Sequence, residues 1–101
     1  MTFTHWQPQP TGEKMNKIVE EVSKLNPRAL VANGLNEAIV GYGAQYGSEP
    51  VIIYDYDACL TVLMRDNKWD HDEAIEWMEY NVVTSYVGQG TPIFMLRGED
   101  E

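Results

Sequence analysis

The stretch from Pro50 to Met64, PVIIYDYDACLTVLM, constrains the fold of this chain more than any other. It follows a Gly-Ser-Glu-Pro turn signal, and its β-branched and aromatic residues 51–54 are typical of a short buried strand. From Asp55 onward the apolar residues take helical spacing, and Asp55 or Asp57 can accept hydrogen bonds from the first helical turn. The sequence therefore predicts a central strand that passes directly into a helix.

The length and composition of the chain favour one compact domain. A chain of 101 residues, 44% of them hydrophobic, can bury roughly two-thirds of its unfolded surface. No apolar run approaches the roughly 20 residues of a membrane span, and the opening MTFTHWQPQP lacks the basic and apolar regions of a signal peptide. We expect a flexible arm at residues 1–10, one domain at 11–96 and an acidic tail at 97–101, in a cytosolic protein.

Apolar spacing predicts three helices, and β-branched or aromatic runs predict three strands. The helices are expected over about residues 12–25, 57–66 and 71–84, and the strands over about 38–42, 51–54 and 93–96. Asp70 is the expected N-cap of the third helix, and Glu73 can complete a capping box. The fold class is therefore α+β, with a small antiparallel or mixed sheet covered by helices.

Acidic residues are concentrated in the second part of the chain. The net charge is −9, and residues 37–101 carry three basic and thirteen acidic side chains, against four basic and three acidic ones in residues 1–36. Such a surface repels nucleic-acid phosphates and anionic lipids, so direct binding of nucleic acid or membrane is not expected. A protein with a basic surface, or a metal ion, would be attracted.

Catalytic and metal-binding patterns are weak in this sequence. Asp55-Tyr-Asp57 resembles the first motif of haloacid-dehalogenase-type phosphotransferases, but the remaining motifs of that family are missing, and helix capping is the favoured role. Cys59 is the single cysteine and is expected to be a buried thiol. The two histidines, His5 and His71, are far apart in sequence, so no zinc-binding spacing exists. We predict no catalytic residue, metal ligand or cofactor.

Glycine-rich residues 41–47 could suggest a phosphate-binding loop. Such a loop needs a helix directly after it, whereas here the glycines lead into the strand at 51–54. A β-hairpin over residues 38–54 is therefore favoured.

The helix expected at 71–84 has an acidic surface with aromatic neighbours. No lysine or arginine occurs between His71 and Ile93. Trp77 and Tyr80 cannot both lie in the apolar stripe of this helix, so one of them is expected to be exposed. The expected partner-binding residues are Asp72, Glu73, Glu76, Glu79, Trp69, Trp77, Tyr80 and, in the arm, Trp6. An ordinary acidic surface without a partner is the alternative.

Four segments, AIVGYG, YDYDACLTVLM, DEAIEWMEYNV and SYVGQGTPIF, together resemble a group of small acidic proteins encoded by bacteriophages. The resemblance covers residues 38–96. It implies a phage origin, and hence the cytoplasm of the infected bacterial host, but it brings no established activity with it.

These observations favour a non-enzymatic phage accessory protein. We expect it to bind a host or phage protein with a basic surface, and to inhibit a host defence or nucleic-acid-handling complex by imitating phosphates with its acidic face. The formation of a homodimer is a further possibility at this point. One alternative is a small-molecule or divalent-metal binding module that uses Asp55, Asp57 and the loop Gly88–Thr91. Another is a virion or assembly component.

Overall fold

The computed structural model describes residues 6–7, 17–32, 34–83, 88 and 90–98. Its centre is a three-stranded mixed sheet in the order β3-β4-β5. The strands are β3 (Ile39–Gly43), β4 (Val51–Asp55) and β5 (Ile93–Met95). β4 pairs antiparallel with β3 and parallel with β5. The predicted α+β class and all three predicted sheet strands are thereby confirmed.

β3 and β4 form the predicted hairpin. The connecting turn places Gly47 at a φ of 86°, and the Ser48 N–H donates to the Gln45 carbonyl at 2.8 Å. A φ in this region favours glycine, which has no Cβ to clash with the neighbouring carbonyl. The glycines of this segment therefore build a hairpin, and the helix that a phosphate-binding loop requires does not follow it.

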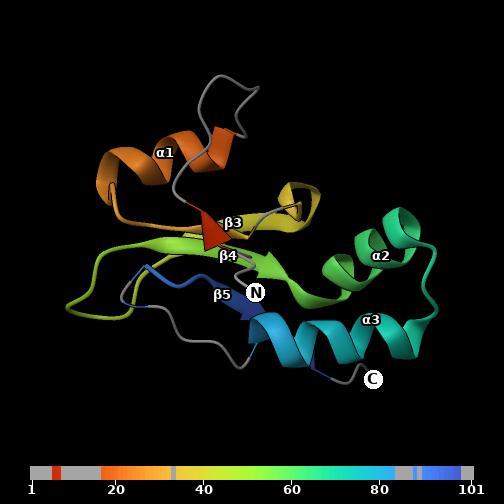
Figure 1. Cartoon of the computed structure of the whole chain (residues 1–101). Coiled ribbons are helices and arrows are strands. Elements are labelled where there is room, and N and C mark those ends of the chain that lie inside the picture. Colours follow the sequence, from red (N-terminus) through yellow and green to blue (C-terminus); the bar gives the residue numbers. More distant parts are fainter. Residues whose placement is uncertain (1–5, 8–16, 33, 84–87, 89, 99–101) are drawn as a thin grey trace.

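Between β4 and β5 the chain is helical up to Val83, apart from a turn at residues 68–70, and β5 pairs parallel to β4 (Figure 1). It begins with α2 (Tyr56–Asn67), which follows β4 without a loop, and continues through α3 (His71–Met78). α3 passes into one turn of π-helix, η2 (Glu79–Val83). The helix predicted at 71–84 is thus present to residue 83, with a change of helical type at Glu79, and position 84 lies outside the described residues.

Two short strands and one helix complete the described structure. α1 (Lys17–Leu25) lies over β3 and β4 in Figure 1. Beyond it, β2 (Val31–Ala32) pairs antiparallel with β1 (Trp6–Gln7). Two residues of the arm predicted at 1–10 thus join the fold through backbone pairing, and the remainder of the arm, with helix positions 12–16, lies outside the described residues.

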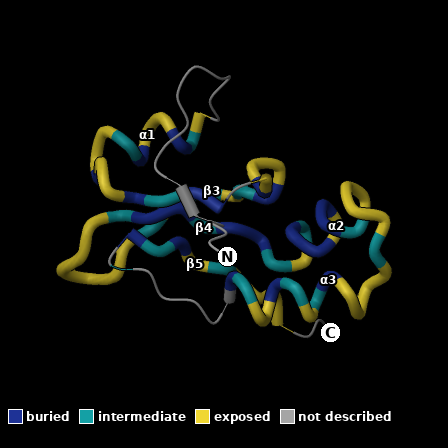
Figure 2. Tube along the Cα trace, viewed as in Figure 1, coloured by how far each residue is buried: buried dark blue, intermediate teal, exposed yellow. Residues whose placement is uncertain are grey.

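The hydrophobic core is continuous from α1 through the sheet to α2 and α3 (Figure 2). Tyr54 of β4 is completely buried and stacks on Phe94 of β5, with ring centroids 5.3 Å apart. Its hydroxyl oxygen accepts a hydrogen bond of 2.7 Å from the Ala32 N–H of β2. One side chain therefore ties the central sheet to the small one.

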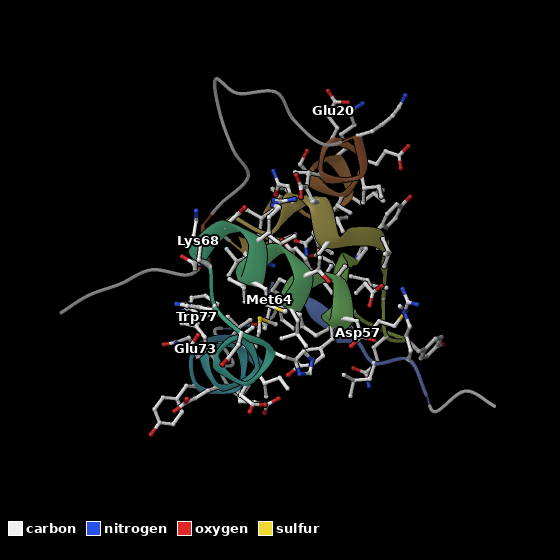
Figure 3. The ribbon with its side chains drawn as sticks, turned by 90° about the vertical axis from the view of Figure 1, so that its right-hand side faces the viewer. Glu20, Asp57, Met64, Lys68, Glu73 and Trp77 are labelled. Atoms are coloured by element: carbon white, nitrogen blue, oxygen red, sulfur yellow. The ribbon has the colours of Figure 1, made fainter. Side chains whose placement is uncertain are left out.

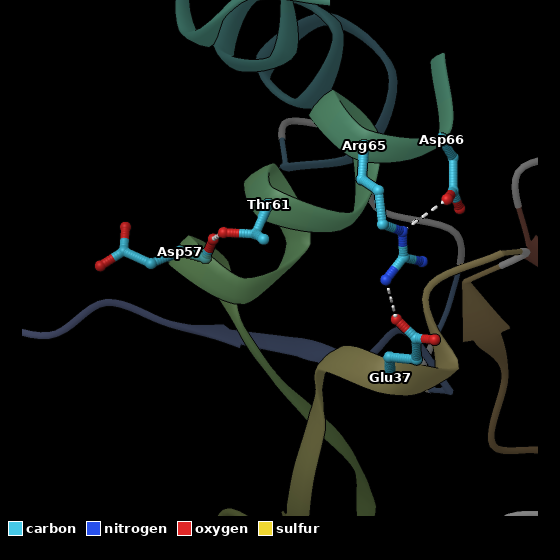
Figure 4. A network of polar contacts seen from close by, with 5 residues as sticks. All are labelled: Glu37, Asp57, Thr61, Arg65 and Asp66. Atoms are coloured by element: carbon cyan, nitrogen blue, oxygen red, sulfur yellow. Dashed lines mark hydrogen bonds and ion pairs between the residues drawn. The ribbon is translucent and has the colours of Figure 1, made fainter. Parts of the chain in front are cut away.

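An exposed ion-pair network joins α2 to η1 (Asn36–Ala38), a short 3-10 turn (Figure 4). Arg65 contacts Glu37 and Asp66, each at 2.8 Å. All three side chains are more than half exposed, so solvent screens the network and it adds little to stability.

In the described part of the chain, no helix has the length and apolarity needed to cross a membrane.

Candidate functional site

A groove of about 290 Å³ runs along the exposed side of α3 and η2. We call it the α3 groove. Its lining combines aromatic and acidic side chains, and the described lining residues include no lysine or arginine. The lining residues are Trp69, Glu73, Glu76, Trp77, Tyr80 and Asn81. Five of the eight residues predicted to bind a partner are therefore brought together in one place.

The turn between α2 and α3 positions Trp69 at one end of the groove. Lys68 is the C-cap of α2, and its left-handed φ of 59° reverses the chain. The next residue, Trp69, donates its backbone N–H to the Met64 carbonyl. α3 then starts with the predicted capping box: the Asp70 side chain accepts from the Glu73 N–H, and the Glu73 side chain accepts from the Asp70 N–H, each at 2.9 Å. This cap fixes the first turn of the helix that carries the groove.

Two tryptophans and a tyrosine form the aromatic part of the groove. The Trp69 and Trp77 ring centroids lie 6.2 Å apart, with their planes tilted by 44°. Both rings are half-buried, whereas Tyr80 is 83% exposed. The prediction that one of Trp77 and Tyr80 is exposed is confirmed. Because the Tyr80 ring is in contact with solvent, a partner can reach it.

Two carboxylates border these rings. Glu73 keeps one oxygen in the capping box, so its other oxygen is left for a further contact. Glu76 is exposed, and its side chain forms no hydrogen bond or ion pair with any residue that the structure describes. Figure 3 shows Glu73 and Trp77 on α3, far from Glu20 on α1. The groove therefore presents unneutralised negative charge beside aromatic surface.

Asn81 belongs to the groove although the sequence analysis did not select it. Its Nδ2 donates to the Trp77 carbonyl at 3.1 Å, which holds the amide against the helix. Asn81 lies four residues after Trp77, and this spacing was the available signal. The wide turn of η2 around it is a rare helical form that occurs often at functional sites.

Three predicted partner-binding residues lie elsewhere. Asp72 and Glu79 are exposed but do not line the α3 groove, and Trp6 lies in β1. Glu79 instead accepts a hydrogen bond of 3.0 Å from the Tyr56 hydroxyl. Burial and this carboxylate together raise the pKa of Tyr56 to about 12. The acidic residues of α3 and η2 thus divide between the groove and a contact with α2.

The residues of the alternative ligand site are not brought together. Asp55 ends β4, and Asp57 lies in the first turn of α2. Gly88 and Gly90 precede β5 and line a separate cleft of about 410 Å³, whose lining does not include either aspartate. Asp55 pairs with Met95, the last residue of β5, whereas Gly88 and Gly90 precede the first residue of that strand. The length of β5 therefore separates Asp55 from the two glycines.

Asp55 has a structural role that accounts for its burial. It is 3% exposed, its side chain accepts from the Asp57 N–H at 3.1 Å as the predicted N-cap of α2, and the Arg97 guanidinium donates to its other oxygen. The hydrogen bond from Arg97, aided by those from the backbone, holds the pKa of Asp55 below its ordinary value of 3.8. The Asp55 carboxylate therefore serves as the N-cap of α2 and as the ion-pair partner of Arg97.

The charge on Asp55 makes stability depend on pH. A carboxyl group with a lowered pKa in the folded state stabilises the fold above its unfolded pKa, and this contribution is lost as the pH falls through the folded pKa. Asp55→Asn keeps a capping side chain but removes the charge. We expect its deficit in free energy of unfolding, measured by urea titration, to be largest near neutral pH and to shrink below about pH 4. A deficit that is equal at both pH values would contradict this assignment.

Cys59, the single cysteine of the chain, lies in α2. Cys59 is completely buried, and its burial raises the pKa of the thiol to about 12, so it is a poor nucleophile at neutral pH. Among residues with described positions, no three His, Cys, Asp or Glu side chains converge on a point that could hold a metal ion. Comparisons with protein-family models, curated protein sequences and solved structures find no match.

Proposed function

We propose that this chain is a non-enzymatic binding protein whose α3 groove engages a basic surface of another protein. The observation that carries the proposal is the composition of the described lining of the groove: three aromatic side chains and two carboxylates, with no basic residue among them. Tryptophan and tyrosine are enriched among residues that dominate binding energy at interfaces. Carboxylates at the rim attract a partner of opposite charge and orient it.

The charge of the whole chain supports the same partner class. A net charge of −9 creates a negative field around the protein, which speeds association with basic proteins and opposes association with nucleic acid. Most of this charge lies in residues 37–101, the part of the chain that includes α3. Long-range attraction and local contacts thus favour the same kind of partner.

The proposal includes the setting that the resemblance over residues 38–96 implies. In that setting the chain is a phage accessory protein in the cytoplasm of the infected host, and its partner is a host or phage protein. A nucleic-acid-handling or defence complex fits as the target because its phosphate-binding surface is basic, and carboxylates on α3 can occupy it.

Removing one groove side chain at a time tests the proposal. With a lysine- and arginine-rich peptide as probe, we expect Trp77→Ala to weaken binding about tenfold, through lost aromatic contact. Glu76→Gln should weaken binding about threefold and reduce its dependence on salt, since it removes a partly screened charge. Isothermal titration calorimetry at two salt concentrations measures both effects.

Glu21→Gln is the matched control because it makes the same charge change on the exposed face of α1. It should leave the affinity within about twofold of the unmodified protein, since the distance from α3 allows salt to screen it. Equal losses in Glu21→Gln and Glu76→Gln would mean that net charge alone attracts the peptide, and the proposal would fail.

A further inference from the structure

We infer that the α3 groove selects arginine over lysine in its partner, holding one guanidinium group flat on an indole face while Glu73 and Glu76 accept its N–H groups. The inference rests on the proposed function and adds the chemical identity of the side chain that is bound. It follows from the separation of the rings, the positions of the carboxylates and the shape of the cation.

The spacing of the two indoles excludes a cation held between them. A flat group between two ring faces needs about 7 Å, twice the contact distance between stacked atoms. The Trp69 and Trp77 centroids are 6.2 Å apart and their planes are tilted by 44°, so the two rings contact each other. A bound cation would therefore lie against the part of a ring that lines the α3 groove, beside the other lining side chains.

Those neighbouring side chains include the two carboxylates. Glu73 precedes Trp77 by four residues, and Glu76 precedes Tyr80 by four, so each carboxylate lies one helical turn from an aromatic ring. Glu73 retains one carboxylate oxygen outside the capping box, and the Glu76 carboxylate has no partner among the described residues. Acceptors are thus available at the edge of a group that is stacked on a ring.

Only one common cationic side chain uses both features at once. A guanidinium group is planar, stacks on an aromatic face and directs its N–H donors outward in the same plane. An ammonium group is compact and strongly hydrated, and it loses more hydration when placed on a ring. A quaternary ammonium favours ring faces but has no proton to donate, so the carboxylates would offer it charge alone.

Two glycine-spaced peptides of equal charge, one with three arginines and one with three lysines, test this selectivity. Nitrogen–proton correlation spectra of the whole chain, followed through the indole N–H signals, give both dissociation constants. We expect the arginine peptide to bind about fivefold more tightly, with shifts at Trp69 and Trp77. In Trp77→Leu, which keeps an apolar side chain but removes the ring, the ratio should fall to about twofold or less.

Tyr80→Leu provides a second variant that should fold normally, because Tyr80 is 83% exposed and exposed side chains contribute little to stability. It should weaken the arginine peptide more than the lysine peptide, whereas Glu21→Gln on α1 should leave the ratio unchanged. Equal affinities of the two peptides, both lost in Trp77→Leu, would overturn the arginine inference and leave the proposed function standing. Absence of binding by either peptide would overturn both.

Discussion

Replacing Gly90 with alanine is expected to lower the free energy of unfolding by about 3 kcal/mol, the upper end of the usual cost of forcing atoms into a packed site. A Cβ at this position would lie 2.1 Å from the Arg28 carbonyl oxygen and 3.0 Å from its carbon. Both are backbone atoms, and they cannot turn aside as a side chain can. Moving the chain apart would also lengthen the hydrogen bond of 3.0 Å from the Leu30 N–H to the Gly90 carbonyl.

Gly41→Ala is the matched control for this substitution. Gly41 lies in β3, and a Cβ built there meets no atom within 4 Å. Urea unfolding followed by circular dichroism should show a large loss for Gly90→Ala and a change within about 0.5 kcal/mol for Gly41→Ala. Similar midpoints for the two variants would show that the segment before β5 does not pack against Arg28.

The second large effect is expected at Tyr54, where phenylalanine should cost about 2 kcal/mol. Tyr54→Phe keeps the ring and its stacking on Phe94 but removes the oxygen that accepts from the Ala32 N–H. Ala32 is buried, so its N–H would lose a partner in a place that water cannot reach. An unsatisfied buried donor costs about 1–3 kcal/mol, which is more than the average hydrogen bond contributes.

Tyr42→Phe is the control that shows what the loss of an exposed tyrosine hydroxyl costs in stability. Tyr42 lies in the same sheet but is 40% exposed, so water can replace its hydrogen bonds. Thermal unfolding should place Tyr54→Phe several degrees below Tyr42→Phe, given the size of the domain. Equal melting temperatures would mean that the contact between Tyr54 and β2 does not stabilise the fold.

Most of this fold was predictable because helix caps, turns and apolar periodicity depend on residues that are close together in the sequence. Asp55 and Asp70 cap the helices that their sequence contexts indicate, and the run after Pro50 forms the central strand. The order of the strands was not predicted, since the parallel pairing of β4 and β5 depends on where the intervening helices pack. Two-residue strands such as β1 carry no periodicity at all.

The α3 groove was predictable to the extent that its residues share one helix face. Glu73, Glu76, Trp77 and Tyr80 follow helical spacing, and Trp69 was included as a flanking aromatic. Asp72 and Glu79 were predicted as partner-binding residues from the same spacing, but they do not line the groove, because sequence does not show which flank of the helix meets α2. Contacts between distant positions escaped prediction, as for Arg97, which was assigned to the tail but donates to Asp55.

We propose that the α3 groove is the surface that meets a basic partner. The most direct test follows the indole N–H signals of all three tryptophans during titration with the arginine-containing peptide. We predict saturable shifts of the Trp69 and Trp77 signals, with Trp6, which lies in β1, as the internal reference. Saturation with the Trp69 and Trp77 signals unmoved would contradict the account, because the peptide would then be bound at a different surface.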